Sequence, residues 1–318
     1  MDRNLALEFV RVTEAAALAA AAHMGRGDEA VADAAAVEAM HRLFPDIEFR
    51  GHLVMGEGDE DSVPMLYVDE VLGTGTGSTI EVAVDALEGA TTCALGAPNA
   101  IVAIAVAEEG GFLRCPADVY MEKIAVGSWG RGVIDLDKSI GDNLAALAEV
   151  KGVKPQNLRV VMLDRPRHAK LLHELRDIDV HVTLISDGDL SAALATTREE
   201  SGVDLLVGTG RAAQGILAAA ALRCLGGEIQ ARFQPGNAAE FEQLRESGVD
   251  DIRKKYTAEE LARGSVVFAA TGVTTGNYLH GVRFFPGGGE SHSVVMRSKS
   301  RTIRFLNTFH YFEEQPEY

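Results

Sequence analysis

The sequence predicts an α/β protein with two domains, and three observations support this fold class. The 318 residues, 47% hydrophobic and 24% charged, are enough for one large core or two modest ones. Strand-like and helical segments alternate in the second half, which is typical of βαβ units. In the first half, apolar strand-like runs end in glycine and carboxylate residues, which indicates a largely buried sheet with a polar edge.

The elements of the first half follow from hydrophobic periodicity. Apolar residues at helical spacing predict a helix over residues 4–24, which a Gly-Arg-Gly sequence ends, and a second helix over residues 31–43. Runs rich in Val, Ile and Ala predict strands at residues 51–55, 79–84 and 99–107.

The second half alternates more regularly. Strands are predicted at residues 158–163, 180–185 and 204–207, with helices at 168–175, 190–196 and 212–224. Strand character returns at residues 265–270, 281–285 and 293–303. Because K-G-V-K-P-Q interrupts the pattern near residue 150, we expect a domain boundary there, with an α+β domain at 1–150 and an α/β domain at 151–318.

Charge and cysteine content exclude several classes of function. A formal net charge of −17 argues against binding to nucleic acid or to anionic membranes, because both need clustered cations. The three cysteines are widely spaced, so neither a disulfide framework nor a zinc site is expected. With no signal-peptide pattern and no apolar run of about 18 residues, we expect a soluble cytoplasmic protein.

Four acidic residues lie in settings suited to cation binding. Asp33 is near the start of the second helix, Glu57 lies in the acidic loop G-E-G-D-E-D, and Asp85 and Glu88 follow a strand. Converging carboxylates repel each other unless they are protonated or bridged by a cation, and oxygen ligands favour Mg²⁺ or Mn²⁺. Taken singly, each of these acidic residues is more simply interpreted as a solvated surface charge than as a metal ligand.

An ordered set of motifs gives the sequence a family resemblance. They are G-R-G-D-x-x-x-A-D at 25–33, V-M-G-E-G-D-E-D-x-x-P-M-L-Y at 54–67, V-D-x-L-E-G at 84–89, Y-M-E-K at 120–123, R-P-R-H at 165–168, I-S-D-G-D at 185–189, F-A-A-T-G-V-T-x-G at 268–276 and S-K-S-R-T-I-R at 298–304. Together they resemble the class II fructose-1,6-bisphosphatases, including the cyanobacterial type that also acts on sedoheptulose 1,7-bisphosphate. The resemblance covers nearly the whole chain.

The resemblance implies a layered αβαβα sugar-phosphatase fold of the inositol-phosphatase-like kind. It implies a phosphatase that uses Mn²⁺ or Mg²⁺ to remove the 1-phosphate of fructose 1,6-bisphosphate, and by extension of sedoheptulose 1,7-bisphosphate, in gluconeogenesis or the Calvin cycle. The expected partner is the phosphorylated sugar, and the expected assembly is a homodimer or homotetramer.

The resemblance also implies roles for individual residues. Metal ligands would be Asp33, Glu57, Asp85, Glu88 and Gln214. Catalytic residues would be Glu57, Asp85, Glu88 and Thr91. Substrate-binding residues would be Gly89, Tyr120, Arg165, Arg167, His168, Asp187, Gly188, Asp189 and Arg211. Arginine suits phosphate because its planar fork binds two oxygens at once.

Simpler interpretations remain for the substrate-binding segments. In these interpretations Pro166 only starts a helix beside solvated arginines, and Asp189 only caps a helix. The alternating Arg297, Lys299 and Arg301 would share one face of a strand, where they either line the phosphate side of the site or balance the acidic surface.

The sequence departs from the family pattern D-P-x-E-G-T at Ala86 and Ala90, the second of which replaces a threonine that helps to position the attacking water. Thr91 is the nearest replacement hydroxyl. Arg211 and Gln214 stand where the family has glycine and a glutamate ligand. With Glu29 in place of lysine, these changes suggest two alternatives: a non-catalytic protein that binds a phosphorylated sugar, or a phosphatase for another phosphomonoester.

Overall fold

A computed structural model describes residues 5–58 and 64–312, which belong to two compact units. The first unit is built from residues 1–111 and 264–318, and the second from residues 112–263. The predicted boundary near residue 150 differs from this division. It lies inside the second unit, where α4 (Ile140–Lys151) ends at Gly152 in the left-handed conformation.

The first unit contains a mixed sheet in the order β12-β13-β11-β4-β3-β1-β2, with β14 paired to β13. Its strands are β1 (Phe49–Met55), β2 (Val71–Leu72), β3 (Ser78–Glu88), β4 (Ile101–Ala107), β11 (Val266–Gly272), β12 (Arg283–Phe285), β13 (Gly288–Arg297) and β14 (Thr302–Tyr311). Only β1 and β3 pair in parallel; the other described pairs are antiparallel. The helical segments are α1 (Leu5–Ala21), α2 (Glu29–Leu43), η1 (Phe44–Asp46) and α3 (Ala90–Leu95).

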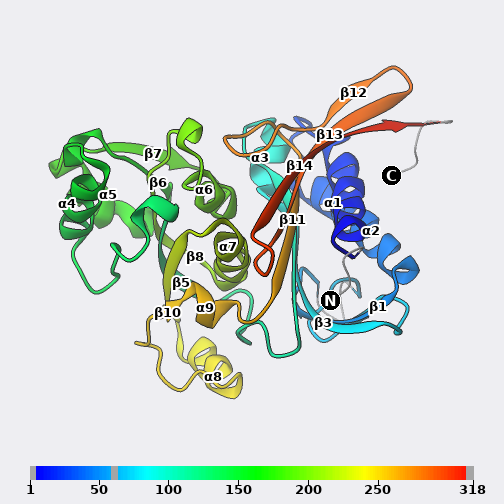
Figure 1. Ribbon diagram of the computed structural model, residues 1–318, viewed down its shortest axis with the longest axis horizontal. Helices are drawn as coiled ribbons and strands as arrows, with labels where there is room; N and C mark the ends of the chain where they lie inside the picture. Colours follow the sequence, from blue (N-terminus) through cyan, green and yellow to red (C-terminus); the bar gives the residue numbers. More distant parts are fainter. Residues whose placement is uncertain (1–4, 59–63, 313–318) are drawn as a thin grey trace. The chain divides into compact units, whose positions relative to one another are not determined.

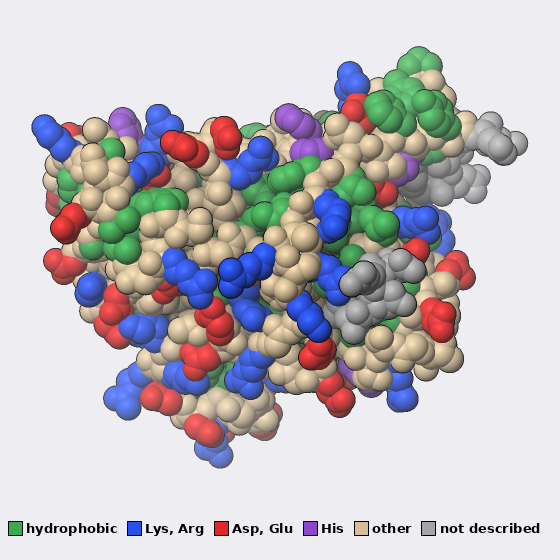
Figure 2. Space-filling view, viewed as in Figure 1, with side chains coloured by type: hydrophobic (Ala, Val, Ile, Leu, Met, Phe, Trp, Pro, Cys, Tyr) green, Lys and Arg blue, Asp and Glu red, His purple; other side chains and the backbone are tan. Residues whose placement is uncertain are grey.

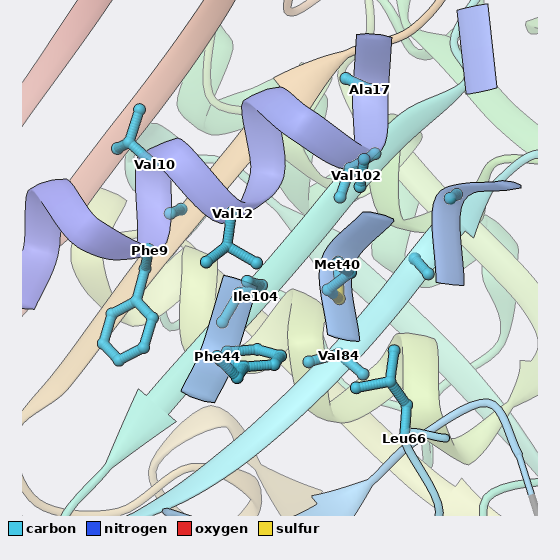
Figure 3. Close-up of a cluster of buried hydrophobic side chains, with 14 of the residues drawn as sticks. Phe9, Val10, Val12, Ala17, Met40, Phe44, Leu66, Val84, Val102 and Ile104 are labelled. Carbon is cyan, nitrogen blue, oxygen red and sulfur yellow. The ribbon is translucent and has the colours of Figure 1, made fainter. Parts of the chain in front are cut away.

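Helices α1 and α2 cover one face of this sheet and form its core (Figure 1). The alanines of α1 bring the helix backbone close to the strands, because their side chains are small and largely buried. Larger side chains fill the remaining space, and Phe9 meets Phe49 edge-on with ring centroids 5.5 Å apart. Figure 3 shows Phe9, Phe44 and Met40 pointing into the layer between helices and sheet.

The predicted strand at 293–303 is wrong, because the chain reverses within it. β13 ends at Arg297, and β14 begins at Thr302 and pairs antiparallel with β13. Arg301 adopts φ +49° in the turn. Arg297 therefore belongs to a strand while Lys299 and Arg301 belong to the hairpin turn, so the three cations do not alternate along one strand face.

Strand β14 presents aromatic side chains on the surface. It pairs with β13 alone among the described strands, so its outer edge is open. Phe309 and Tyr311 are 55% and 79% exposed, and both rings contact Phe285 of β12. Figure 2 shows hydrophobic side chains gathered where β12 projects from the unit. A surface of this kind is typical of protein interfaces.

The second unit contains a mixed sheet in the order β10-β9-β5-β8-β6-β7. Its strands are β5 (Tyr120–Val126), β6 (Arg159–Leu163), β7 (His181–Ile185), β8 (Leu205–Arg211), β9 (Glu228–Phe233) and β10 (Tyr256–Thr257). The other helices are α5 (Ala169–Asp177), α6 (Asp189–Ala195), α7 (Ala212–Leu225), α8 (Ala238–Glu246) and α9 (Ala258–Leu261), and short 3₁₀ turns are η2 (Ser128–Gly130), η3 (Pro155–Asn157), η4 (Pro166–His168) and η5 (Glu199–Ser201).

The parallel strands β7, β6 and β8 confirm the βαβ pattern predicted for this part of the chain. Helices α4 and α5 lie on one face of the sheet, and α6 and α7 lie on the other (Figure 1). The predicted α/β fold class is therefore confirmed, with helices layered on a mixed sheet in each unit. Among the described helices, none combines the length and the apolar character that crossing a bilayer requires.

Candidate functional site

The end of β3 turns two carboxylates to the same face of the sheet. Residues three apart on a regular strand point to opposite faces. Here Asp85 pairs with Ala103 and Glu88 pairs with Ile101, so β3 contains one residue more than β4 between these pairs. This bulge places Asp85 and Glu88 on one face, where both side chains are buried. The sequence motif V-D-x-L-E-G therefore does bring its two acids together.

The bulge also connects β3 to Glu57. The Ala86 amide donates a hydrogen bond of 2.7 Å to Glu57 Oε1. In the pairing of β1 with β3, the register also shifts between Leu53 and Met55, just before the chain reaches Glu57. Glu57 is thus held beside the Asp85–Glu88 segment. The neighbouring acids Asp59, Glu60 and Asp61 lie outside the described residues.

Gly89 allows the sharp passage from β3 into α3. Its φ of +93° is unfavourable for residues with a side chain, and a Cβ atom there would lie 2.6 Å from Thr92 Oγ1. Thr92 is buried and donates its hydroxyl proton to the Gly89 carbonyl at 2.7 Å. Thr91, in the first turn of α3, is only half-buried. Of the two hydroxyls, that of Thr91 is therefore the better placed to meet a ligand.

Asp33 lies in the second turn of α2, a helix that packs against α3 and β3. Burial raises the pKa of Asp33, because its ionised form loses hydration without a compensating contact large enough to offset this. Glu29 is exposed in the first turn of the same helix, where a negative charge interacts favourably with the helix dipole. The acidic residue at position 29 thus has a structural explanation that involves no ligand.

The donor set fits a hard divalent cation in chemical type. Asp33, Glu57, Asp85 and Glu88 offer only oxygen, which Mg²⁺ and Mn²⁺ prefer. However, within residues 5–58 and 64–312 no three acidic, histidine or cysteine side chains lie close enough together to hold a metal ion.

In the second unit, Tyr120 and Arg167 form one contact group. The Arg167 guanidinium lies over the Tyr120 ring, 4.6 Å from its centroid, and donates to the Thr209 carbonyl from Nε and Nη2 at 3.1 and 2.8 Å. These contacts fix its position although it is exposed. Arg165 donates to its neighbour's carbonyl, that of Asp164, at 3.0 Å. The R-P-R-H motif enters α5 through a 3₁₀ turn that begins at Pro166.

His168 differs from its predicted role in substrate binding. Its side chain is buried, with Nδ1 donating to the Leu163 carbonyl at 2.8 Å and Nε2 accepting from the Thr209 amide at 2.8 Å. Burial is the main cause that lowers its pKa, so the neutral ring is favoured. With both nitrogens bonded to the backbone, His168 links β6 to β8 and offers no polar atom to a substrate.

Asp189 forms a buried ion pair with Lys123. The Nζ and Oδ2 atoms are 2.6 Å apart, and the side chains are only 4% and 12% exposed. Gly210 makes room for the pair, because a Cβ atom there would lie 2.3 Å from Asp189 Oδ2. Asp187 accepts a hydrogen bond from the Gly188 amide at 3.0 Å, and Gly188 takes φ +95° as the residue that caps α6. Lys123 was not predicted as a site residue, although Y-M-E-K contains it.

Arg211 and Gln214 lie where β8 passes into α7. Arg211 pairs in register with Tyr120 across the sheet, and its guanidinium is 3.4 Å from the exposed carboxylate of Asp118. Because the Arg211 side chain is 61% exposed, it extends away from the core. Gln214 is half-buried in the first turn of α7.

Each unit thus brings together one part of the predicted site. The first unit groups Glu57, Asp85 and Glu88 around the β3 bulge, with acidic oxygens suited to a cation. The second unit groups aromatic and cationic side chains with the Lys123–Asp189 pair, which suits a phosphorylated polyol.

Comparison with known proteins gives a consistent result. Residues 3–310 match the family described as bacterial fructose-1,6-bisphosphatase, glpX-encoded. Three relatives are named D-fructose 1,6-bisphosphatase class 2/sedoheptulose 1,7-bisphosphatase, and each is 40% identical to this chain. They come from Crocosphaera subtropica (346 residues, 100% of this chain and 99% of the relative), Thermosynechococcus vestitus (344 residues, 99% and 98%) and a Synechococcus species (335 residues, 98% and 96%).

Proposed function

The chain belongs to the bacterial fructose-1,6-bisphosphatase family that glpX encodes, and on this premise we propose that it removes the 1-phosphate of fructose 1,6-bisphosphate with a divalent metal ion. Sedoheptulose 1,7-bisphosphate is a second proposed substrate, because it is in the names of the relatives. The observation that most supports the proposal is the β3 bulge, which turns Asp85 and Glu88 to one face beside Glu57.

The proposed metal ligands are Asp33, Glu57, Asp85, Glu88 and the amide oxygen of Gln214. When bound, Mn²⁺ or Mg²⁺ neutralises charge on the phosphoryl oxygens and makes water more acidic. The chain's own contribution is to hold carboxylates on a rigid, buried strand end, where the Ala86 amide orients Glu57. The half-buried Thr91 hydroxyl is proposed to orient water in place of the family threonine that Ala90 replaces.

The second unit is proposed to bind the sugar and its distal phosphate. Arg167 suits a phosphate because Tyr120 and the Thr209 carbonyl fix its guanidinium before any ligand arrives. Asp187 and Asp189 are proposed to accept hydrogen bonds from sugar hydroxyls, with Lys123 fixing the orientation of Asp189. Arg165 and Arg211 add positive charge near the same strand ends.

The decisive test is Mn²⁺-dependent phosphate release from fructose 1,6-bisphosphate by the purified protein, beside a variant that carries Glu29→Lys, Ala90→Thr and Gln214→Glu. Comparable rates would show that the natural site works as it stands. Turnover by the triple variant alone would favour the non-catalytic alternative. Asp85→Ala should abolish metal-dependent release, and retained turnover in that variant would refute the metal assignment.

We also propose a homodimer or homotetramer in a reducing cytoplasm, in which the reaction serves gluconeogenesis or the Calvin cycle. The open edge and exposed aromatic side chains of β14 support self-association. The buried free cysteines suit a reducing compartment. Light scattering on the wild type and on Phe309→Asp tests the assembly: a smaller particle for the variant supports β14 as an interface, and an unchanged mass contradicts it.

A further inference from the structure

A cavity of about 380 Å³ lies in the first unit, between the start of α1 and the hairpin of β13 and β14. Volumes of roughly 300–1,000 Å³ are typical of sites for small molecules. Among the described residues, two arginines, two hydroxyl side chains and three apolar side chains line the cavity, and no acidic one does. In a chain with a formal net charge of −17, such a lining is suited to an anion.

The pairing of β13 with β14 brings the two arginines, Arg297 and Arg304, to one face of the sheet. Arg297 lies opposite Thr302 and Arg304 lies opposite Val295, and directly opposed residues share a face. The arginines are therefore diagonal neighbours, a position at which Cα atoms are roughly 7–8 Å apart. Val295 belongs to the core that α1 covers, so both arginines are on the side of the sheet where α1 lies (Figure 1). Two guanidinium groups can thus reach one ligand in the cavity.

Neither arginine has an acidic partner within residues 5–58 and 64–312. Arg304 Nη1 donates to the Thr302 hydroxyl at 3.1 Å, and that hydroxyl lies 2.8 Å from the Ser300 hydroxyl. Arg297 Nε is shielded from solvent and has no hydrogen-bond partner. Neighbouring like charges repel each other, and partial removal from water strengthens the repulsion. An anion bound between the two guanidinium groups would replace this repulsion by attraction.

The two acidic residues of α1 make their contacts elsewhere. Glu8 Oε1 lies 3.1 Å from Arg11 Nη1 on the surface of the helix. Glu14 Oε1 accepts a hydrogen bond of 2.6 Å from the Thr308 hydroxyl, further along β14. Helix α1 therefore brings no carboxylate to the cavity, and the positive charge of the arginines is available to a ligand.

The cavity lies at the opposite end of the sheet from the β3 bulge. Glu88 is in register with Ile101, and Ile101 with Gly272, the last residue of β11. Arg297 is in register with Val267, near the other end of β11. At about 3.4 Å per residue, these two positions are roughly 17 Å apart along the strands. A small ligand in the cavity is therefore separate from any ligand at the bulge carboxylates.

We propose that this cavity binds the phosphate group of a small ligand other than the substrate, through Arg297, Arg304 and the Thr302 hydroxyl. One arginine fork already occupies both oxygens of a carboxylate, whereas the three oxygens of a phosphate can accept from two arginines and a hydroxyl. The ligand has two potential sources: inorganic phosphate, or an organic phosphate whose body lies against apolar side chains such as Leu7 and Val295. In either case it joins α1 to the hairpin.

Calorimetric titration of the chelator-treated full chain with inorganic phosphate tests the cavity without requiring turnover. The parent protein carries Arg167→Gln, so that the proposed sugar site contributes little to binding. Arg297→Gln/Arg304→Gln should weaken phosphate binding about a hundredfold, at about tenfold for each lost contact. Lys299→Gln/Arg301→Gln is the matched control, because it removes two exposed charges of the same turn that do not line the cavity. Equal binding by the two variants, or no phosphate binding by the parent, would overturn the proposal.

The single variant Arg304→Gln keeps the test valid if the double variant fails to fold, because Arg304 is exposed. It should weaken phosphate binding about tenfold. Thermal unfolding gives an independent readout. Phosphate at about a hundred times its dissociation constant should raise the unfolding midpoint of the parent much more than that of the variant. An equal rise in both proteins would contradict binding at this cavity.

Phenylphosphonate distinguishes the two sources, because its aromatic ring is joined to phosphorus by a bond that a phosphatase does not cleave. Leu7 is 49% exposed, so Leu7→Ser should leave the fold intact. Tighter binding of phenylphosphonate than of phosphate, lost in Leu7→Ser, would identify an organic phosphate as the ligand. Equal or weaker binding of phenylphosphonate, unchanged in Leu7→Ser, would identify inorganic phosphate.

Discussion

Removing Lys123 should destabilise the protein more than almost any other single loss of charge. In the wild type, Lys123 Nζ lies 2.6 Å from Asp189 Oδ2. The Lys123→Met substitution keeps a long apolar side chain in place but leaves Asp189 without this cation. Because the two side chains are only 4% and 12% exposed, water cannot replace the missing partner. Breaking a buried pair in this way costs about 3–5 kcal/mol. At about 2–4 °C per kcal/mol, the midpoint of thermal unfolding should fall by about 6–20 °C.

The double variant Lys123→Met/Asp189→Leu is the matched control, because it removes both charges and leaves no unpaired ion. Thermal unfolding followed by circular dichroism should show that the double variant recovers most of the lost stability. Since Asp189 is also proposed to bind the sugar, activity should stay low in both variants. A fall of less than about 2 °C for Lys123→Met would refute the reasoning, because the pair would then be effectively solvated.

Three further predictions concern backbone strain, pH and thiol reactivity. Gly89→Ala should cost about 1–3 kcal/mol in urea unfolding, because of the positive φ and the contact with Thr92. Gly75→Ala, which has φ +78° but no atom within 4 Å, should cost less, and equal losses would contradict a role for the contact. Burial lowers the pKa of His168 below its ordinary 6.5, so below that pH the unfolded chain binds a proton that the folded protein does not. The free energy of unfolding should therefore fall as pH drops through 6.5 toward the pKa of the folded state. A His168→Asn variant should lose less of this free energy than the wild type between pH 7.5 and 5.5. Burial raises the pKa of Cys115 to about 12, so this thiol should react with disulfide reagents only after unfolding, and rapid labelling of the native protein would contradict its burial.

The sequence was most informative where a regular pattern meets a regular element. Helices α1 and α2 and the parallel strands β6 and β8 were predicted within a few residues, because their hydrophobic periodicity reflects burial. Strand β7 was predicted from its apolar composition, although its side chains are half-buried or exposed. Helix α4 and strands β5 and β9 were not predicted. In β5 the buried positions include Lys123, and a charged residue at a core position hides the apolar pattern of a strand.

The sequence was least informative at irregular features of the backbone, such as a bulge or a turn. No periodicity argument shows that one extra residue in β3 turns Asp85 and Glu88 to the same face, since a spacing of three predicts opposite faces. The hairpin turn at Arg301 has a positive φ without a glycine, so the sequence contains no turn signal there and predicts a continuous strand. The predicted boundary near residue 150 differs from the division into two compact units, because local patterns carry no information about which distant strand β4 will pair with.

The interrupted connectivity of the first unit also affects how the protein is made. Strand β4 pairs along one edge with β3, which precedes it, and along the other with β11, which follows the whole second unit in the sequence. The ends of that second unit are tied together, since the Leu113 amide donates to the Leu261 carbonyl at 3.0 Å. During synthesis, the second unit can therefore fold first, while the edge of β4 that pairs with β11 stays unpaired until the last part of the chain has been made. Aggregation during synthesis should start at this unpaired edge of β4. The need for chaperones should therefore depend on how fast residues 112–263 fold.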